Sequence, residues 1–268
     1  MNYDASLIAN VVMITLAVQV IIATGELLIL HRVYRKDGLL SWVVQRTGPK
    51  LGTYVKMLRL DFVCRYPNVL VFFALRILCA MALPVAILFD YPTLPLLLII
   101  TATGLIMQVR NSQSNDGSDQ MAIIGFIALT LASVIDTDVS WSYALFFIAA
   151  QASLAYGVSG FLKSQKKGWY NGEYVTEILK TSSYGDKKML KAALKRKWIA
   201  KALGQKVVYG DCLLAISFAF PPVVCISVLS FGIILHIGIA RIMGLNTFLW
   251  SYVSTYPAIL YVSSVIYS

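Results

Sequence analysis

The sequence predicts an all-α integral membrane protein: a polytopic bundle of about eight transmembrane helices with interfacial amphipathic helices beside them. Of its 268 residues, 58% are hydrophobic and only 13% are charged. A soluble domain usually carries roughly 25% charged residues, so this chain cannot cover a globular surface with polar groups. Its 23 Lys and Arg residues are concentrated between apolar segments. We expect one transmembrane domain over residues 1–268, and the composition excludes an ordinary soluble enzyme, a disordered protein and a nucleic-acid-binding protein.

A transmembrane helix needs roughly 20 mostly apolar residues. Each apolar segment of about that length therefore predicts one helix. Two of the segments are short, which indicates tilting, a locally thin bilayer or a re-entrant helix; these are 94–109 and 121–135. The segments that each predict one helix are 7–30, 69–89, 94–109, 121–135, 143–162 and 247–267.

A further apolar segment, 207–243, is about twice as long as one transmembrane helix needs to be. Pro221 and Pro222 interrupt it near the middle, and consecutive prolines remove two backbone donors and clash with the preceding turn. We interpret the segment as two helices that turn at these prolines, which gives eight spans. A single kinked helix, which gives seven spans, is the alternative.

The basic residues predict the orientation. Segments 31–66 and 163–206 hold eight and twelve of the 23 Lys and Arg residues. With eight spans they lie on one side of the membrane, whereas loops 90–93 and 136–141 on the other side contain acids and no base. Lys and Arg accumulate in cytoplasmic loops, so we expect the basic segments in the cytoplasm and both termini outside.

Both basic segments also predict helices that lie in the membrane interface. Residues 39–60 mix apolar, aromatic and basic side chains, and residues 187–206 read as a basic amphipathic helix. Its lysines predict attraction to anionic lipids at the cytoplasmic face, worth ~1 kcal/mol per charge near the surface; a docking surface for an acidic peptide is the alternative. The residues that can share its apolar stripe are Met189, Leu190, Ala193, Leu194, Trp198 and Ile199.

Polar residues inside a membrane are costly and are candidates for function. In the span 143–162 and just after it, Gln151, Tyr156, Ser159 and Lys163 are spaced to share roughly one helical face, and Gly160 permits close approach of a helix or a ligand. Lys163 is either a snorkelling cation at the helix end or, if desolvated, a base that works near neutral pH.

Two further ionisable residues follow in the next apolar runs, Asp211 and then His236. A membrane cavity that holds Lys, Asp and His has the components of acid–base chemistry. The polar loop before the span 121–135 contains Asp116, Asp119 and Gln120. Asp119 or its neighbour Ser118 can cap the next helix, although the loop carries more acceptors than a cap requires.

The four cysteines have no CxxC spacing and no His partner at metal spacing, so the sequence predicts no metal site. Three of them lie in apolar runs, where a free cysteine acts as a small hydrophobic side chain.

The order of the polar residues resembles the HTTM (horizontally transferred transmembrane) family, which is related to the membrane domain of vitamin K-dependent gamma-carboxylase and to sporulation-delaying protein B-like proteins. The resemblance covers about residues 70–260. It rests on Gln151-x4-Tyr156-x3-Gly160-x2-Lys163 followed by Trp169-x2-Gly172, on Asp116-Gly117-Ser118-Asp119-Gln120, and on Asp211, His236 and residues 244–248.

The resemblance implies an enzyme of the bacterial cytoplasmic membrane that modifies a small peptide or another small molecule. A reduced quinone of the vitamin K or menaquinone type is the implied cofactor, with Lys163 as the base. The implied catalytic residues are Lys163, His236 and Asp211, and the implied cofactor-binding residues are Gln151, Tyr156, Gly160 and Trp169.

Two other functions stay open at this point. The chain is also similar to accessory proteins that mature a secreted peptide toxin, and a small secreted peptide encoded beside it would favour that function. A non-catalytic transporter or scaffold is the third possibility, but the sequence has no evident inverted repeat.

Overall fold

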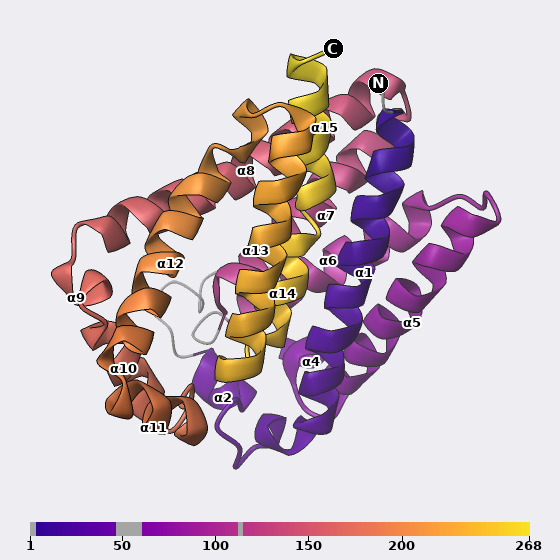
Figure 1. The fold of residues 1–268 in the computed structure, drawn as a ribbon. Coiled ribbons are helices and arrows are strands. Elements are labelled where there is room, and N and C mark those ends of the chain that lie inside the picture. The colour runs from indigo at the N-terminus through magenta and orange to yellow at the C-terminus, as the bar shows by residue number, and fades with distance from the viewer. Residues whose placement is uncertain (1–3, 47–60, 112–114) are drawn as a thin grey trace. The chain divides into compact units, whose positions relative to one another are not determined.

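The computed structural model describes residues 4–46, 61–111 and 115–268 (Figure 1). All regular elements in these ranges are helices, as the sequence predicts. The chain divides into two compact units. We call Ala9–Ala144 the N-unit, and Met1–Ile8 together with Leu145–Ser268 the C-unit.

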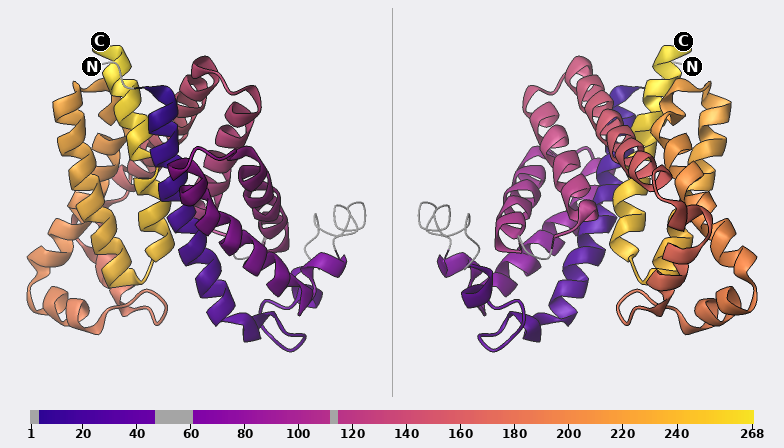
Figure 2. Two further views of the ribbon diagram at one scale, coloured as in Figure 1. Left: turned by 90° about the vertical axis from the view of Figure 1, so that its right-hand side faces the viewer. Right: turned by 90° about the vertical axis from the view of Figure 1, so that its left-hand side faces the viewer.

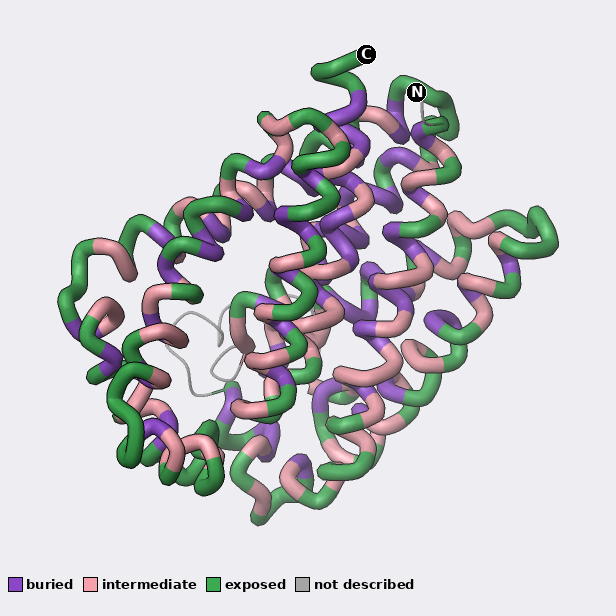
Figure 3. The backbone as a smooth tube through the Cα atoms, viewed as in Figure 1, coloured by how far each residue is buried: buried purple, intermediate pink, exposed green. Residues whose placement is uncertain are grey.

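Five helices in the described ranges are long and apolar enough to cross a membrane: α1 (Ala5–Ile29), α5 (Asn68–Leu88), α7 (Gly117–Ile135), α8 (Asp138–Ser164) and α13 (Pro222–Met243). A sixth apolar helix, α6 (Leu94–Arg110), is shorter, as the short segment 94–109 predicts. Exposed residues occur along these helices (Figure 3). Many of them are apolar, for example Leu78 at 63% and Ile234 at 68% exposure. Since a soluble protein would bury such a surface, the helices fit an integral membrane protein.

The count of eight spans is not confirmed. The predicted span 247–267 consists of two short helices, α14 (Asn246–Val253) and α15 (Tyr256–Ile266), with a break at Ser254 and Thr255. Both side chains donate to the backbone of the preceding turn, Ser254 Oγ to Ser251 O at 2.8 Å and Thr255 Oγ1 to Tyr252 O at 2.7 Å. A proline in the first turn of α15 has no N–H with which to continue α14.

The segment 207–243 contains two helices, not one kinked helix. α12 (Lys197–Ala215) ends before the prolines, the short turn η2 (Ser217–Ala219) follows, and α13 begins at Pro222. A proline is tolerated at a helix start because the N–H it lacks would have no intrahelical partner there. α12 begins well before the apolar run, so its first half is basic.

The predicted interfacial helix 187–206 is also divided. α11 (Lys187–Lys195) ends at Arg196, where the backbone leaves the helical region, and α12 begins directly after it. Met189, Leu190 and Ala193 pack against Leu179 and Ala200. Two other residues of the predicted stripe, Leu194 and Trp198, are 58% and 64% exposed and do not belong to this packed group.

Two short helices lie before α11, and a third lies in the other basic segment, 31–66. α9 (Lys167–Tyr170) and α10 (Glu173–Lys180) precede α11, and η1 (His31–Tyr34) follows α1. Most of the predicted helix 39–60 lies outside the described residues. The flanking elements are α2 (Trp42–Gln45) and α4 (Asp61–Cys64).

Within the N-unit, α6 packs between α5 and α7 (Figure 2). The two acid-containing loops lie at one end of these helices, because Asp90 and Asp136 line a common cavity of about 470 Å³ together with Asn10 of α1. Arg110 lies at the far end of α6 and contacts the segment after α1. The acidic loops and Arg110 therefore lie at opposite ends of α6.

Arg110 has a role that the sequence does not indicate. Its side chain is completely buried. Its Nε donates to Cys64 O at 3.1 Å, Nη1 to Asn111 Oδ1 at 2.8 Å and Nη2 to Leu40 O at 3.0 Å. The guanidinium also lies 4.3 Å from the centre of the Tyr34 ring. Arg110 thus joins the segment after α1, the end of α4 and the end of α6.

Burial beside Arg110 predicts an unreactive thiol at Cys64. Cys64 is buried whereas Cys212 is exposed, and burial raises the pKa of Cys64 to about 11. The thiolate is the reactive form, so a membrane-permeant maleimide should modify a Cys212-only variant at pH 8 and leave a Cys64-only variant unmodified. Because the folded pKa is raised, Cys64 keeps its proton at neutral pH and becomes reactive only as the pH approaches 11. Equal labelling rates at pH 8 would contradict this assignment.

Candidate functional site

An ion pair joins α8 to α12 in the C-unit. Lys163 Nζ lies 2.6 Å from Asp211 Oδ2. Ser159, one turn before Lys163 on α8, donates from Oγ to the same Oδ2 at 2.8 Å and accepts from Nζ at 2.5 Å. The side chains of Lys163 and Asp211 are 25% and 9% exposed. Lys163 is therefore not a free snorkelling cation, and its ammonium is additionally 5.6 Å from the centre of the Trp169 ring of α9.

Gly160 brings the backbones of the two helices together at this point. A Cβ at Gly160 would lie 2.8 Å from Cys212 Sγ and 3.2 Å from Asp211 Cβ, distances that real Cβ atoms rarely allow. From the sequence, Gly160 can accommodate either a helix or a ligand. In the structure, α12 packs against Gly160. The glycine thus sets the helix separation at which Lys163 and Asp211 can meet.

A second polar cluster is buried one to two turns earlier along α8. The hydroxyl of Tyr156 lies 2.8 Å from His236 Nε2 of α13 and 3.0 Å from the hydroxyl of Tyr256 of α15. The Tyr252 ring stacks on His236, with centroids 5.3 Å apart and planes 9° apart. Gly232 makes room for the cluster, because a Cβ there would overlap the Tyr256 hydroxyl.

One ring nitrogen of His236, Nδ1, takes no part in the hydrogen bonds of this cluster. Its Nδ1 is buried and has no hydrogen-bond partner within the described part of the chain. A buried polar atom without a partner costs free energy of about 1–3 kcal/mol. Nδ1 is therefore the atom of this cluster that still lacks a partner among the described residues.

The two clusters belong to one electrostatic environment. Tyr156, Ser159 and Lys163 lie on successive turns of α8, at spacings that put them on one face. The charge of Lys163 acts on His236, and that of Asp211 acts on Tyr156. A proton gained or lost in one cluster therefore changes the potential in the other.

Gln151 does not join these residues. It lies five residues before Tyr156, which corresponds to about 140° around the helix, and its side chain has no hydrogen bond to any described residue. The expectation that it shares the polar face is therefore wrong for Gln151.

The acidic loop has a local role in the N-unit. Asp116 caps α7, with Oδ1 accepting from Ser118 N at 2.8 Å and Asp119 N at 3.2 Å, while Asp119 Oδ2 accepts from Asp116 N at 3.4 Å. The predicted cap exists, but Asp116 rather than Asp119 or Ser118 is the capping residue. Gln120 is exposed.

Two residues of the second cluster have no place in the sequence prediction, namely Tyr252 and Tyr256. The signal that could have found them is the aromatic spacing of four residues through Phe248, Tyr252 and Tyr256, which places rings on one helical face. Apolar content alone, which predicts the span 247–267, does not distinguish these rings from other apolar side chains.

No family model matches this chain. No curated protein and no solved structure matches it either.

The Tyr156 hydroxyl should contribute measurably to stability. In the variant Tyr156→Phe, His236 Nε2 and the Tyr256 hydroxyl lose their shared partner while they stay buried, and each such group costs about 1–3 kcal/mol. We expect a lower midpoint of thermal unfolding in detergent than for the wild type. Tyr143→Phe is the matched control, because Tyr143 lies on the same helix and is 71% exposed. If both variants unfold at the wild-type temperature, the hydrogen bonds of Tyr156 do not stabilise the fold.

Proposed function

We propose that this protein is an integral membrane enzyme that exchanges a proton between buried side chains of the C-unit and a bound substrate. The observation that carries the proposal is the presence of the Lys163–Asp211 pair and the Tyr156–His236–Tyr256 cluster along one face of α8. Ionisable residues inside a membrane bundle are rare and mark functional sites by default. Helix association alone would need only a small residue such as Gly160 and apolar contacts.

The ion pair provides a route by which Lys163 can become a base. As an ammonium paired with Asp211 it has no free lone pair. Transfer of one proton from Nζ to Oδ2, across the 2.6 Å contact, leaves a neutral amine and a carboxylic acid. The amine can then accept a proton from a substrate, which restores the ammonium, and Asp211 can give its proton to the product, which restores the carboxylate and the ion pair.

A reduced quinone of the vitamin K or menaquinone type is the cofactor that we propose. When bound, it supplies a phenolic proton and reducing electrons. The unpartnered and buried Nδ1 of His236 fits an oxygen of such a molecule as its missing partner. Lys163 and His236 are the residues that would hold and deprotonate it, and a small peptide is the proposed substrate class.

We further propose that the basic segments face the cytoplasm and that both termini face outside. In support, the acidic loops of the N-unit line one cavity and Arg110 lies at the other end of α6. Lys and Arg predominate on the cytoplasmic side of membrane proteins. The basic helix α11 and the basic first half of α12 would then lie against anionic lipids.

The test is quinol oxidation by the purified protein in lipid vesicles, in air-equilibrated buffer with dioxygen as the electron acceptor, followed by absorbance. We expect Lys163→Ala and His236→Ala each to reduce the rate about 100-fold, the scale of general acid–base catalysis. Lys180→Ala is the control, because Lys180 forms an exposed pair with Glu177 at 2.7 Å. Unchanged rates in both site variants would refute the proposal.

A further inference from the structure

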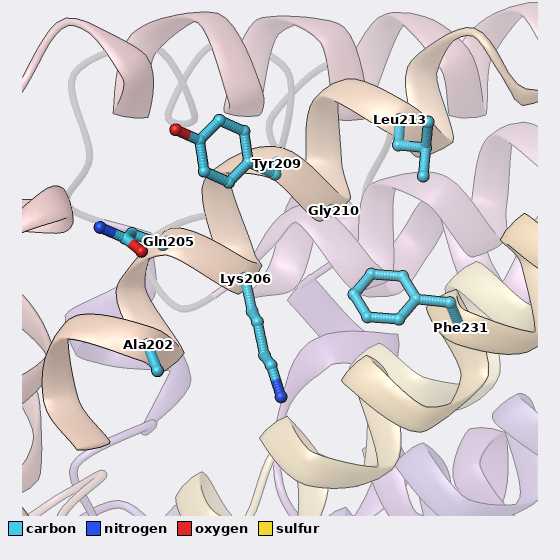
Figure 4. Close-up of a pocket in the computed structure, with 7 residues that line it drawn as sticks. All are labelled: Ala202, Gln205, Lys206, Tyr209, Gly210, Leu213 and Phe231. Carbon is cyan, nitrogen blue, oxygen red and sulfur yellow. The ribbon is translucent and has the colours of Figure 1, made fainter. Parts of the chain in front are cut away.

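A groove runs between α12 and α13 in the C-unit, apart from the ion pair and the tyrosine cluster (Figure 4). Its volume is about 360 Å³. Gln205 and Lys206 line one end, and Gly210, Leu213 and Phe231 line the rest. The side chains of Lys206 and Phe231 extend into the space between the two helices (Figure 4).

The close packing of the two helices forms the floor of the groove. A Cβ at Gly210 would lie 3.0 Å from Phe231 Cε1 and 3.1 Å from Leu235 Cδ2. Leu213 is 38% exposed at the side of the groove. The groove is thus an apolar channel on a surface that faces away from the packed interior.

Polarity changes along the groove in one direction. The half of α12 before the groove carries Lys197 and Lys201, whereas the half from residue 207 onward has Asp211 as its only charged residue, and that carboxylate is paired with Lys163. Lys206 lies at the boundary, is exposed, and forms no ion pair with any described residue. From Lys206 to Leu213 the helix rises about 10 Å. One cation followed by an apolar wall of this length is complementary to an amphiphile with a negative head.

We propose that this groove binds one anionic phospholipid, with the phosphate at Lys206 and an acyl chain along Gly210, Leu213 and Phe231. None of the lining residues is acidic, so nothing opposes a phosphate at the Lys206 end. A zwitterionic lipid also carries a phosphate, but its choline cation opposes the charge of Lys206, so its head group gains less net attraction than an anionic one does. The site is independent of the proposed enzyme activity, since it shares no residue with the Lys163 pair or the tyrosine cluster.

The experiment is native mass spectrometry of the full chain in detergent, titrated with phosphatidylglycerol or phosphatidylcholine of identical acyl chains. We expect one phosphatidylglycerol to bind preferentially to the wild type. The variant Lys206→Gln should weaken phosphatidylglycerol binding roughly fivefold, the factor expected for one basic residue at an anionic head group, and leave phosphatidylcholine binding unchanged. The matched control is Lys201→Gln, an exposed lysine on the same helix outside the groove, which should bind as the wild type does.

A second variant tests the apolar part. Leu213→Trp adds bulk at a partly exposed position, so it should fill the groove, without disturbing the core, and weaken the binding of both lipids. An excess of glycerol 3-phosphate should not displace bound phosphatidylglycerol, because a head group alone lacks the acyl contact. Equal binding of the two lipids to the wild type, equal effects of Lys206→Gln and Lys201→Gln, unchanged binding to Leu213→Trp, or displacement by glycerol 3-phosphate would each overturn the proposal.

Discussion

Replacement of Asp211 by alanine should lower the free energy of unfolding by about 3 kcal/mol, the low end of the range for a broken buried ion pair. The reason is that Lys163 and Ser159 both depend on Asp211 Oδ2, at 2.6 Å and 2.8 Å. Without the carboxylate, Lys163 keeps its charge in a largely apolar bundle. The estimate stays at the low end because the lysine side chain is 25% exposed and water screens part of its charge. Thermal and denaturant unfolding in detergent measure the change.

Two further variants separate this ion pair from surface electrostatics. Glu177→Ala breaks a pair of similar length, 2.7 Å, whose side chains are 49% and 61% exposed, and exposed pairs contribute at most about 1 kcal/mol. The double variant Lys163→Met with Asp211→Leu should recover part of the loss, since no uncompensated charge remains. If Asp211→Ala is as mild as Glu177→Ala, the buried pair does not stabilise the C-unit.

The variant Arg110→Leu should be the most destabilising in the N-unit, with a loss of about 4–5 kcal/mol, the range that marks loss of a buried network. Leucine is shorter and donates no hydrogen bond. Three acceptors then lose their donor, namely Cys64 O, Asn111 Oδ1 and Leu40 O. The ring of Tyr34 also loses the guanidinium that lies over it. The midpoint of thermal unfolding in detergent reports the loss.

Arg110→Lys and Arg65→Ala are the matched controls. Lysine preserves the charge but lacks the planar fork that reaches three acceptors in different directions, so Arg110→Lys should lose most of the same stability. Arg65 is 62% exposed and lies 3.9 Å from Asp61, and its removal should change stability by less than about 1 kcal/mol. A wild-type midpoint for Arg110→Lys would show that charge rather than geometry matters at this position.

The helical class and the apolar helices could be predicted because they depend on local composition. Apolar length identifies α1, α5 and α7, and the consecutive prolines identify the turn before α13. The break between α14 and α15 escaped prediction, because a serine and a threonine can be accommodated within a helix as well as end one. Only the contacts of Ser254 and Thr255 with the preceding turn reveal which occurs.

The sequence predicts which residues belong to the candidate site better than it predicts which of them pair with one another. Lys163, Asp211 and His236 stand out because each is ionisable in an apolar context. That Lys163 pairs with Asp211, 48 residues away, depends on how α8 and α12 pack, which no local pattern encodes. Tyr256 is 100 residues from its partner Tyr156, and a tyrosine in an apolar helix does not signal a hydrogen bond.

Arg110 is another residue whose contacts cannot be predicted from the sequence. Counted with the other basic residues, it marks a membrane edge, and its position at the end of α6 agrees with that. Its complete burial accompanies contacts with Leu40 and Cys64, which are far from it in the chain. A charge count along the sequence cannot distinguish such an arginine from one that points into water.

The hydroxyl of Tyr156 carries a single hydrogen yet faces two partners, His236 Nε2 and the Tyr256 hydroxyl. The three groups therefore form a directional chain of hydrogen bonds, that is, a proton wire. Either every hydrogen points toward histidine or every hydrogen points toward Tyr256. A proton that hops along the wire reverses this direction, and the wire must turn back before it conducts a second proton. In the proposed enzyme the cluster would consequently deliver one proton per reset, and the rate at which the hydroxyls turn would set an upper limit on repeated transfer.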